Sequence, residues 1–209
     1  MIDLIEKYFQ NLTDLQKKQF AMLQELYQDW NSKINVISRK DMDYLYLHHV
    51  LHSLAITQMI TFKAGTKIID VGCGGGFPGI PLAILMPDVN FLLIDSIRKK
   101  IKVTTAIAEA VGLKNVRAIQ CRAEELKDEK CHFVVSRAAM QMKDLVHSSM
   151  HLVNTKDQFN ALPNGIICLK GGNLTSELNP FKNKAIVEDI YPNFDEEYFK
   201  TKQVIYLPV

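Results

Sequence analysis

The sequence lacks the features that mark membrane, secreted and fibrous proteins. Its 209 residues contain no uninterrupted apolar run of about 18 residues, the length that a membrane span requires. Residues 1–6 lack the basic start and apolar core of a signal peptide. Seven prolines and ten glycines are too few for a collagenous or linker-rich chain. We therefore expect a cytoplasmic globular protein with no membrane partner.

The four cysteines are too dispersed to form a site of their own. Cys73, Cys121, Cys131 and Cys168 contain no CxxC pair and no disulfide framework. We therefore expect reduced thiols, as in cytosolic proteins, and no zinc ribbon.

Charge is nearly balanced, with one local exception. Lys and Arg total 25 against 23 Asp and Glu, a net charge of +2. The densest cationic cluster is Arg98, Lys99 and Lys100, followed by Lys102. Such a run is either the solvated first turn of a helix or a patch that contacts phosphates, because RNA affinity depends on clustered cations.

The first 62 residues are predicted to form an N-terminal helical extension. Thr13 to Gln16 has the form of an N-terminal capping box. A break is expected over 31–38, and a second helix from about 39 to 60. Apolar residues after the capping box recur at roughly helical spacing and predict the first long helix: Leu15, Phe20, Leu23, Leu26, Tyr27 and Trp30.

From residue 63 to 209, short apolar runs alternate with helix-length segments. Short apolar runs bounded by Gly, Pro or Asp are typical of buried parallel strands, and the alternation indicates βαβ units. The last two runs are close enough in sequence to pair as a hairpin. We predict a three-layer α/β core with a mostly parallel seven-stranded sheet. Strands are expected at 67–71, 91–94, 116–120, 133–136, 165–169, 185–191 and 203–209, and helices at about 79–86, 98–111 and 141–153.

The most informative segment joins the first of these strands to the first core helix. Asp70 stands near the end of the strand, and Gly72, Gly74 and Gly76 follow in a GxGxG pattern. A dinucleotide GxGxxG would need glycine at 77, where Phe77 stands. Glycine lets a ligand approach the main chain closely. In S-adenosylmethionine enzymes such a loop surrounds the amino-acid end of the ligand, and Asp70 would lie near its ammonium group. The alternative is a tight strand-to-helix turn without a ligand.

Two further acids extend this site toward an adenosine. Asp95 ends the next strand, where a carboxylate can accept both ribose hydroxyls or cap the following helix. Nicotinamide enzymes have an acid at the same position, so Asp95 does not distinguish between the two cofactors. Ala123 and Glu124 follow the third strand. Glu124 either binds the adenine amino group or begins a surface helix.

Several blocks in a fixed order carry a family resemblance. Beside 70–81, they are 30–35 (WNSKIN), 95–100 (DSIRKK), 122–124 (RAE), 136–138 (SRA) and 170–171 (KG). Together they resemble the bacterial small-subunit ribosomal RNA guanine-N7 methyltransferases, also called the glucose-inhibited division protein B family. The resemblance covers most of the chain. It implies a class I S-adenosylmethionine-dependent methyltransferase with a Rossmann-like fold, which methylates N7 of a guanine in small-subunit (16S) ribosomal RNA.

The resemblance also implies roles for individual residues. The expected partner is small-subunit ribosomal RNA or the small ribosomal subunit, and we expect the enzyme to act as a monomer without a metal. The resemblance implies cofactor contacts at Gly72, Phe77, Ala123, Glu124 and Arg137, and the glycine loop and strand ends discussed above add Asp70, Gly74, Gly76 and Asp95. Substrate contacts are expected at His49, Arg98, Lys99, Lys100 and Lys170.

One block departs from the family. Where the family usually has Arg-His-x-x-Asp-Ser, this chain has His48-His49-x-x-His52-Ser53. Arg and Asp at i and i+4 of a helix can form an ion pair. His48 and His52 cannot reproduce it without a shared proton or a partner elsewhere, so the change bears on RNA positioning. A metal held by both histidines is the weaker interpretation, since no third ligand has a convincing spacing.

Methylation of guanine N7 does not require acid–base catalysis by the enzyme. N7 carries a free lone pair, so no general base and no covalent intermediate are expected, and orientation is sufficient. The segment after the fourth strand lacks the Asn/Asp-Pro-Pro-aromatic motif of enzymes that methylate exocyclic amines. Arg137 stands there, and we expect it to position substrate or cofactor; the alternative is an ion pair with Asp70 or Glu124. Competing functions are methylation of another acceptor, a nicotinamide dehydrogenase, and a non-catalytic RNA-binding assembly factor.

Overall fold

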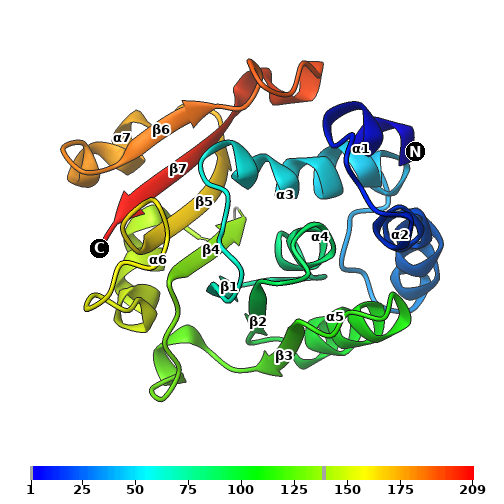
Figure 1. Cartoon of the computed structure of the whole chain (residues 1–209), viewed down its shortest axis with the longest axis horizontal. Helices are drawn as coiled ribbons and strands as arrows, with labels where there is room; N and C mark the ends of the chain where they lie inside the picture. The colour runs from blue at the N-terminus through cyan, green and yellow to red at the C-terminus, as the bar shows by residue number, and fades with distance from the viewer. Residues whose placement is uncertain (1, 138–139) are drawn as a thin grey trace.

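The computed structural model describes residues 2–137 and 140–209, which contain one seven-stranded sheet (Figure 1). The strand order is β3-β2-β1-β4-β5-β7-β6. Strands β1 to β5 pair in parallel, and β7 runs antiparallel to both β5 and β6, which confirms the mostly parallel sheet and the terminal hairpin. The strands are β1 (Lys67–Val71), β2 (Asn90–Asp95), β3 (Val116–Gln120), β4 (Phe133–Arg137), β5 (Gly165–Gly171), β6 (Ile186–Asp189) and β7 (Lys202–Pro208).

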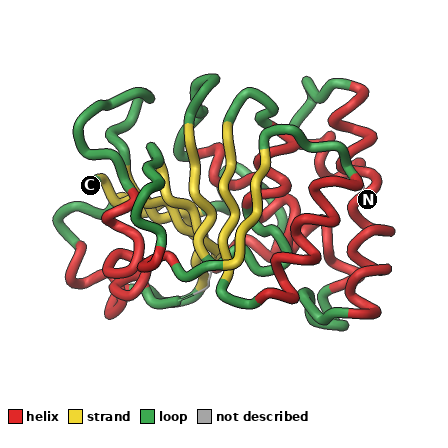
Figure 2. The backbone as a smooth tube through the Cα atoms, turned by 90° about the horizontal axis from the view of Figure 1, so that it is seen from below, coloured by secondary structure: helices red, strands yellow, loops and turns green. Residues whose placement is uncertain are grey.

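Helices cover both faces of the sheet, so the predicted three-layer architecture is confirmed (Figure 2). Successive residues of a strand point to opposite faces. Ile68 accordingly packs into the core beneath α4 (Gly79–Leu85) and α5 (Arg98–Ala110), whereas Ile69 packs into a second core with α6 (Met142–Ser149). Short helices complete the described core: η4 (Ala123–Glu125), η5 (Met150–Leu152), α7 (Thr175–Leu178), η6 (Asn179–Phe181) and η7 (Glu197–Thr201).

The extension begins with α1 (Ile2–Tyr8) and α2 (Asp14–Lys33). The capping box is confirmed: the Gln16 amide donates to the Thr13 hydroxyl over 3.2 Å, and the Gln16 side chain accepts from the Thr13 amide over 2.9 Å. Leu15, the first apolar residue of the helical spacing, is 64% exposed. The face toward the core instead runs through Gln16, Gln19, Phe20, Leu23 and Tyr27, at i, i+3, i+4, i+7 and i+11, and both glutamines donate to carbonyls of the core.

The predicted second helix over 39–60 is irregular rather than α-helical. It consists of η1 (Met42–Tyr44), a π-helical segment η2 (Leu45–Leu51), α3 (His52–Leu54) and η3 (Ala55–Gln58). Two carbonyls of η2 accept side-chain hydrogen bonds, His48 from Arg137 and His49 from Ser53. Wide π turns occur where such contacts interrupt the α-helical ladder, and they often mark functional sites.

The extension and the sheet share one hydrophobic cluster. It joins Ile5, Phe20 and Leu23 of the extension to Ile80 and Phe91 of the core. The division at residues 62 and 63 therefore stays a prediction, because side chains from both parts bury one another.

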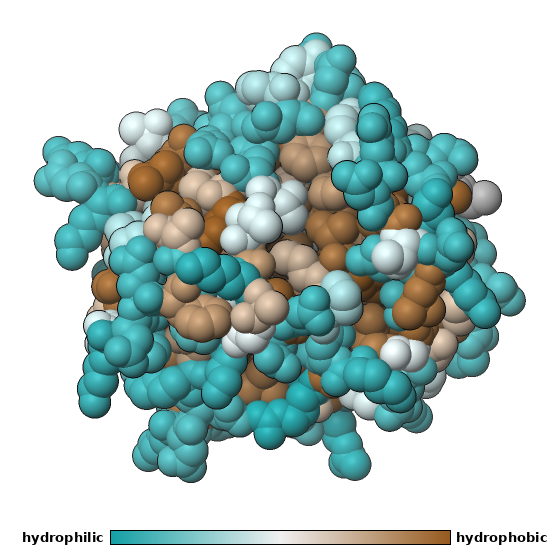
Figure 3. Space-filling model, in the orientation of Figure 1, coloured by the Kyte–Doolittle hydropathy of each residue, from teal (hydrophilic) through white to brown (hydrophobic). Residues whose placement is uncertain are grey.

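The surface is mixed in polarity. On the face in Figure 3, hydrophobic residues show in the middle and hydrophilic side chains project around the rim. Within 2–137 and 140–209, no helix combines the length and the apolar character needed to cross a membrane.

Candidate functional site

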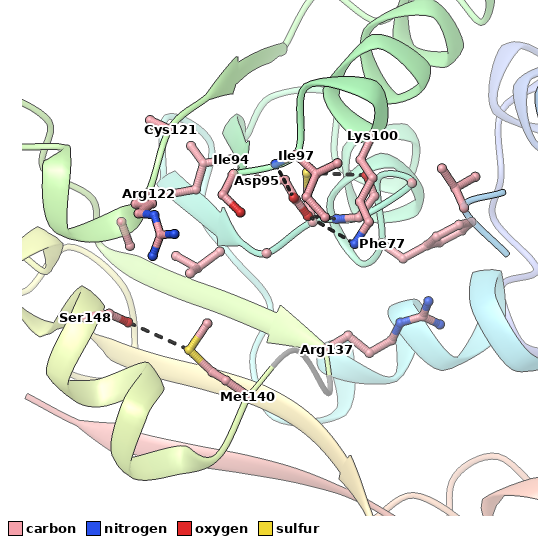
Figure 4. A pocket seen from close by; sticks show the side chains of 18 of the residues that line it. Phe77, Ile94, Asp95, Ile97, Lys100, Cys121, Arg122, Arg137, Met140 and Ser148 are labelled. Atoms are coloured by element: carbon pink, nitrogen blue, oxygen red, sulfur yellow. Dashed lines mark hydrogen bonds and ion pairs between the residues drawn. The ribbon is translucent and has the colours of Figure 1, made fainter. Parts of the chain in front are cut away.

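A cavity of about 420 Å³ opens where parallel strands β1, β2 and β4 end (Figure 4). In open α/β sheets this edge is where ligands bind. Its walls come from the glycine loop, from the segments after β2 and β3, from the end of β4 and from the extension. The lining includes most of the predicted cofactor residues: Gly72, Gly74, Phe77, Asp95, Ala123, Glu124 and Arg137.

The glycine loop presents main chain to this cavity. Gly72 and Gly74 adopt positive φ angles of 71° and 57°. A Cβ atom added at Gly74 would meet nothing within 4 Å, so open space faces it. Gly76 has another role, since a Cβ there would lie 2.6 Å from Cγ1 of Ile80. Gly76 thus lets α4 pack closely and does not line the cavity, whereas Gly75, which we did not predict, does.

Asp95 anchors this loop from the end of β2. Its Oδ2 accepts from the Gly74 amide over 3.0 Å, and its Oδ1 accepts from the Ile97 amide over 2.9 Å. The Lys100 ammonium lies 3.8 Å from Oδ2, and Asp95 is only 7% exposed. The carboxylate is therefore held rigidly, and its remaining lone pairs are placed to accept from a ligand in the cavity.

Asp70 lies beneath the loop rather than in the cavity wall. It is fully buried, and its Oδ2 accepts from the Gly79 amide at the start of α4 over 2.8 Å. Its Oδ1 has no hydrogen-bond partner. Burial raises the pKa of Asp70 to about 7. The predicted contact with a ligand ammonium is thus not made from the cavity lining.

Replacing Asp70 with asparagine is expected to change how stability depends on pH. Asp70 in the folded protein takes up its proton near pH 7, against a usual pKa of 3.8. Its contribution to the free energy of unfolding therefore falls as pH rises from about 4 to above 7. Relative to the wild type, Asp70→Asn should gain stability over that range, by about 1 kcal/mol or more at pH 8. Urea denaturation of both proteins at pH 5 and pH 8 measures this, and a difference independent of pH would contradict it.

Phe77 and Arg137 form one cluster at the end of β4. The Tyr27 ring stacks on Phe77 at 4.9 Å, and the Tyr27 hydroxyl donates to the Gly75 carbonyl over 2.7 Å. The Arg137 guanidinium lies 4.9 Å from the centre of the Phe77 ring. The glycine loop is therefore held from the extension side by a buried tyrosine that the sequence marked only as a core residue.

Arg137 bonds to the extension rather than to an acid. Its Nη1 donates to the His48 carbonyl over 2.9 Å, and its Nη2 donates to Nδ1 of His49 over 2.8 Å. Burial lowers the pKa of Arg137 to about 10 and that of His49 to about 3, so at neutral pH the first is charged and the second neutral. Figure 4 shows the side chain directed from β4 toward the helical segment of the extension. In the described part of the chain, neither Asp70 nor Glu124 forms an ion pair with it.

The other predicted contacts are distributed over the molecule. Ala123 and Glu124 lie at the end of the cavity formed by η4, with Glu124 exposed. Arg98 and Lys99 are exposed on the first turn of α5. Lys170 is 8% exposed, its ammonium lies 2.7 Å from Glu177, and it also donates to the Met140 carbonyl. Direct contact of Lys170 with RNA would require it to leave this buried pair.

The extension closes one side of the cavity through Val36, which we did not predict. Asn31 fixes the segment that carries it: Oδ1 accepts from the amides of Val36 and Ile37 over 2.8 and 3.0 Å, and Nδ2 donates to the Ile37 carbonyl over 2.8 Å. In the sequence, the Trp30-Asn31 pair of the family pattern was the feature that could have pointed to this segment.

Replacing Asn31 with alanine is expected to free this segment. Two main-chain amides and one carbonyl lose their partner, at a cost of about 1–3 kcal/mol in the free energy of unfolding. Because Val36 would no longer be held against the cavity, affinity for S-adenosylmethionine should fall several-fold. Thermal unfolding and calorimetric titration measure the two effects. Asn35→Ala is the control, since Asn35 is exposed; equal effects of both substitutions would refute this role.

The polar groups at the cavity suit an adenosyl ligand. The carboxylate of Asp95, the open main chain at Gly74 and the exposed carboxylate of Glu124 line one continuous space. Over 2–137 and 140–209, no three His, Cys, Asp or Glu side chains are grouped as ligands for a metal ion.

Comparisons with known proteins agree with this geometry. Residues 16–204 match the family model described as "rRNA small subunit methyltransferase G". The chain is 59% identical over 207 residues to "Ribosomal RNA small subunit methyltransferase G" of Porphyromonas gingivalis, which covers 99% of this chain and 93% of that protein. The protein of the same name from Parabacteroides distasonis is 57% identical over 99% of this chain and 89% of its own length.

A solved structure shows the same fold. A SAM dependent methyltransferase from Aquifex aeolicus superposes with a TM-score of 0.53, at 14% identity, over 74% of this chain and 88% of its own. At this identity the likeness concerns the fold alone, which is the Rossmann-like fold of class I methyltransferases.

Proposed function

The chain belongs to the rRNA small subunit methyltransferase G family, and from this premise we propose that it transfers a methyl group from S-adenosylmethionine to N7 of a guanine in small-subunit (16S) ribosomal RNA. The observation that carries the proposal is the cavity at the carboxyl edge of the sheet. Its lining includes Asp95, Gly74 and Glu124, which can hydrogen-bond to or lie against an adenosyl ligand, and also Arg137.

The residues of the chain have distinct roles in holding the two reactants. S-adenosylmethionine, when bound, supplies an electrophilic methyl group. Asp95 accepts the ribose hydroxyls, and the main chain at Gly72 and Gly74 passes close to the amino-acid end. Ala123 and Glu124 face the adenine. These contacts are supported by the cavity lining and by the rigid anchoring of Asp95.

Orientation accounts for catalysis in this proposal. Guanine N7 attacks with its own lone pair, so no side chain has to remove a proton. Arg137 is a positioning residue: its hydrogen bonds to the extension hold η2 against the end of β4. The N-terminal helices thus form part of the wall along which the guanine approaches.

The alternatives have less support. A dinucleotide site would need glycine at position 77, where Phe77 is buried and stacked on Tyr27. An assembly factor without activity would not need an anchored carboxylate at the ribose position. The proposed enzyme acts as a monomer, and a ribosomal substrate supports a cytoplasmic location.

Mapping of methylated nucleotides tests the proposal. Small-subunit RNA from cells that lack the protein should contain one unmethylated guanine, and purified protein with S-adenosylmethionine should restore its N7 methyl group. Methylation of another atom would show that guanine N7 is not the acceptor. RNA binding without methyl transfer would favour the assembly factor.

A further inference from the structure

A second cavity, of about 320 Å³, shares Arg137 with the first. It is otherwise lined by different residues, from the 41–52 part of the extension, the carboxyl end of β5 and the C-terminal segment 198–202. None of the cofactor contacts proposed above uses this space, except that Arg137 stands between the two cavities.

Positive charge predominates in its lining. Arg137, Lys170 and Lys202 face Asp41, and the Lys170 ammonium is paired with Glu177. Among the described residues, Lys202 has no carboxylate within 4.0 Å, and its ammonium lies over the Tyr198 ring, 4.8 Å from the ring centre. The ammonium of Lys202 is therefore available to an anion.

The neighbouring glycine leaves room for the Lys202 side chain. A Cβ atom at Gly171 would lie 2.9 Å from both Cδ and Nζ of Lys202. The side chain of Lys202 thus lies across the end of β5, where the family pattern has its Lys-Gly pair.

An aromatic column leads from this cavity to the surface. Tyr44 stacks on His48 at 4.8 Å with an interplanar angle of 13°, and His48 stacks on Tyr198 at 4.0 Å and 19°. Asp41 holds His48, with 3.0 Å between Oδ1 and Nδ1. His48 therefore has a partner in Asp41 rather than in His52. The outer member of the column, Tyr44, is 54% exposed.

His52 adds a polar group without a partner. It lines the cavity, is 5% exposed, and its Nε2 has no hydrogen-bond partner. Buried polar atoms in proteins are normally satisfied, so this nitrogen is an exception among the described residues.

We propose that this second cavity binds the single-stranded RNA that flanks the methylated guanine, with Lys202 on a phosphate and Tyr44 stacked on a base. The inference rests on the proposed function. Guanine N7 lies in the deep, narrow groove of an RNA helix, so an enzyme reaches it in unpaired RNA, whose flanking bases are free to stack. A free ammonium beside an exposed aromatic column matches a phosphate followed by a base.

Lys202→Ala, with Lys200→Ala as its matched control, tests the phosphate contact. Lys200, two residues away, lies over Tyr191 at 5.5 Å and pairs with Glu197, outside the cavity. Binding of full-length small-subunit RNA is measured at several salt concentrations. Lys202→Ala should weaken binding about 3- to 10-fold and reduce the slope of log Kd against log salt by about 0.7, the value for one phosphate of a single strand. Lys200→Ala should match the wild type, and the Kd for S-adenosylmethionine should be unchanged in both.

Tyr44→Leu and Tyr44→Phe test the stacking contact. Loss of the ring should raise the KM for RNA about 10-fold at unchanged kcat, and phenylalanine should restore it. Wild-type affinity in both Lys202→Ala and Tyr44→Leu would overturn the inference. So would weaker binding at an unchanged salt slope, which indicates a structural role. A defect confined to assembled subunits would assign the cavity to a protein instead. If the wild type binds RNA but transfers no methyl group, the proposed function fails and these binding results still stand.

Discussion

Asp95→Ala is expected to reduce the affinity for S-adenosylmethionine at least 100-fold and to abolish methylation under ordinary cofactor concentrations. The substitution removes the acceptor proposed for the ribose hydroxyls and also the acceptor of the Gly74 and Ile97 amides. Each main-chain donor left without a partner costs about 1–3 kcal/mol. The ligand therefore loses its hydrogen bonds to Asp95, and the glycine loop that surrounds it loses its conformation.

Asp95→Asn separates these two losses. Its amide oxygen replaces one carboxylate acceptor, so the variant should lie between alanine and the wild type. Calorimetric titration with S-adenosylmethionine gives the affinities, and thermal unfolding without ligand gives the stability. Lys100→Ala is the control at the same position of the cavity, because it removes a cation 3.8 Å from Asp95 and no main-chain acceptor. Near wild-type affinity in Asp95→Ala would exclude the carboxylate from the cofactor site.

Arg137→Ala is expected to lower kcat by at least about 100-fold while the protein stays folded. Arg137 holds the His48 carbonyl and Nδ1 of His49, so its removal leaves η2 without its attachment to β4. The reacting groups would then lose orientation, and small displacements are costly when catalysis depends on proximity. Single-turnover methylation at saturating S-adenosylmethionine and RNA measures the effect.

Two variants sharpen this test. Arg137→Lys keeps the charge but cannot donate from two positions of a planar group, so most of the loss should remain. Arg122→Ala removes an exposed cation from the lining of the same cavity and should leave kcat within a few-fold of the wild type. A rate near wild type in Arg137→Ala would remove this residue from the mechanism.

The sheet was predictable because each strand carries its own signal. The runs at 67–71 and 116–120 have the bounds of β1 and β3: Gly65 and Gly72 flank the first run, and Asn115 precedes the second. The prediction of one regular helix over 39–60 was wrong because the cause of its irregularity is not local in sequence. Its π turn accompanies contacts with Arg137, which is about 90 residues away in sequence, and periodicity reports only local neighbours.

The candidate site was predictable in part. Gly74 and Asp95 line the cavity, as expected from a glycine loop and an acid at the ends of adjacent parallel strands. Asp70 was expected to contact the cofactor and Lys170 the RNA, but Asp70 lies under the loop and Lys170 forms a buried pair with Glu177. Position along a strand does not say whether a side chain faces ligand or core.

The sequence by itself determined the succession of strands and helices along the chain, the glycine loop and the membership of a methyltransferase family. These features depend on local composition and on motifs formed by neighbouring residues. Only the tertiary structure decided that Arg137 joins β4 to the extension, that Asp41 is the partner of His48, and that Lys202 has no acidic partner among the described residues. Hydrogen bonds and ion pairs form between whichever groups the folded chain brings within about 3–4 Å, and sequence separation does not limit that choice.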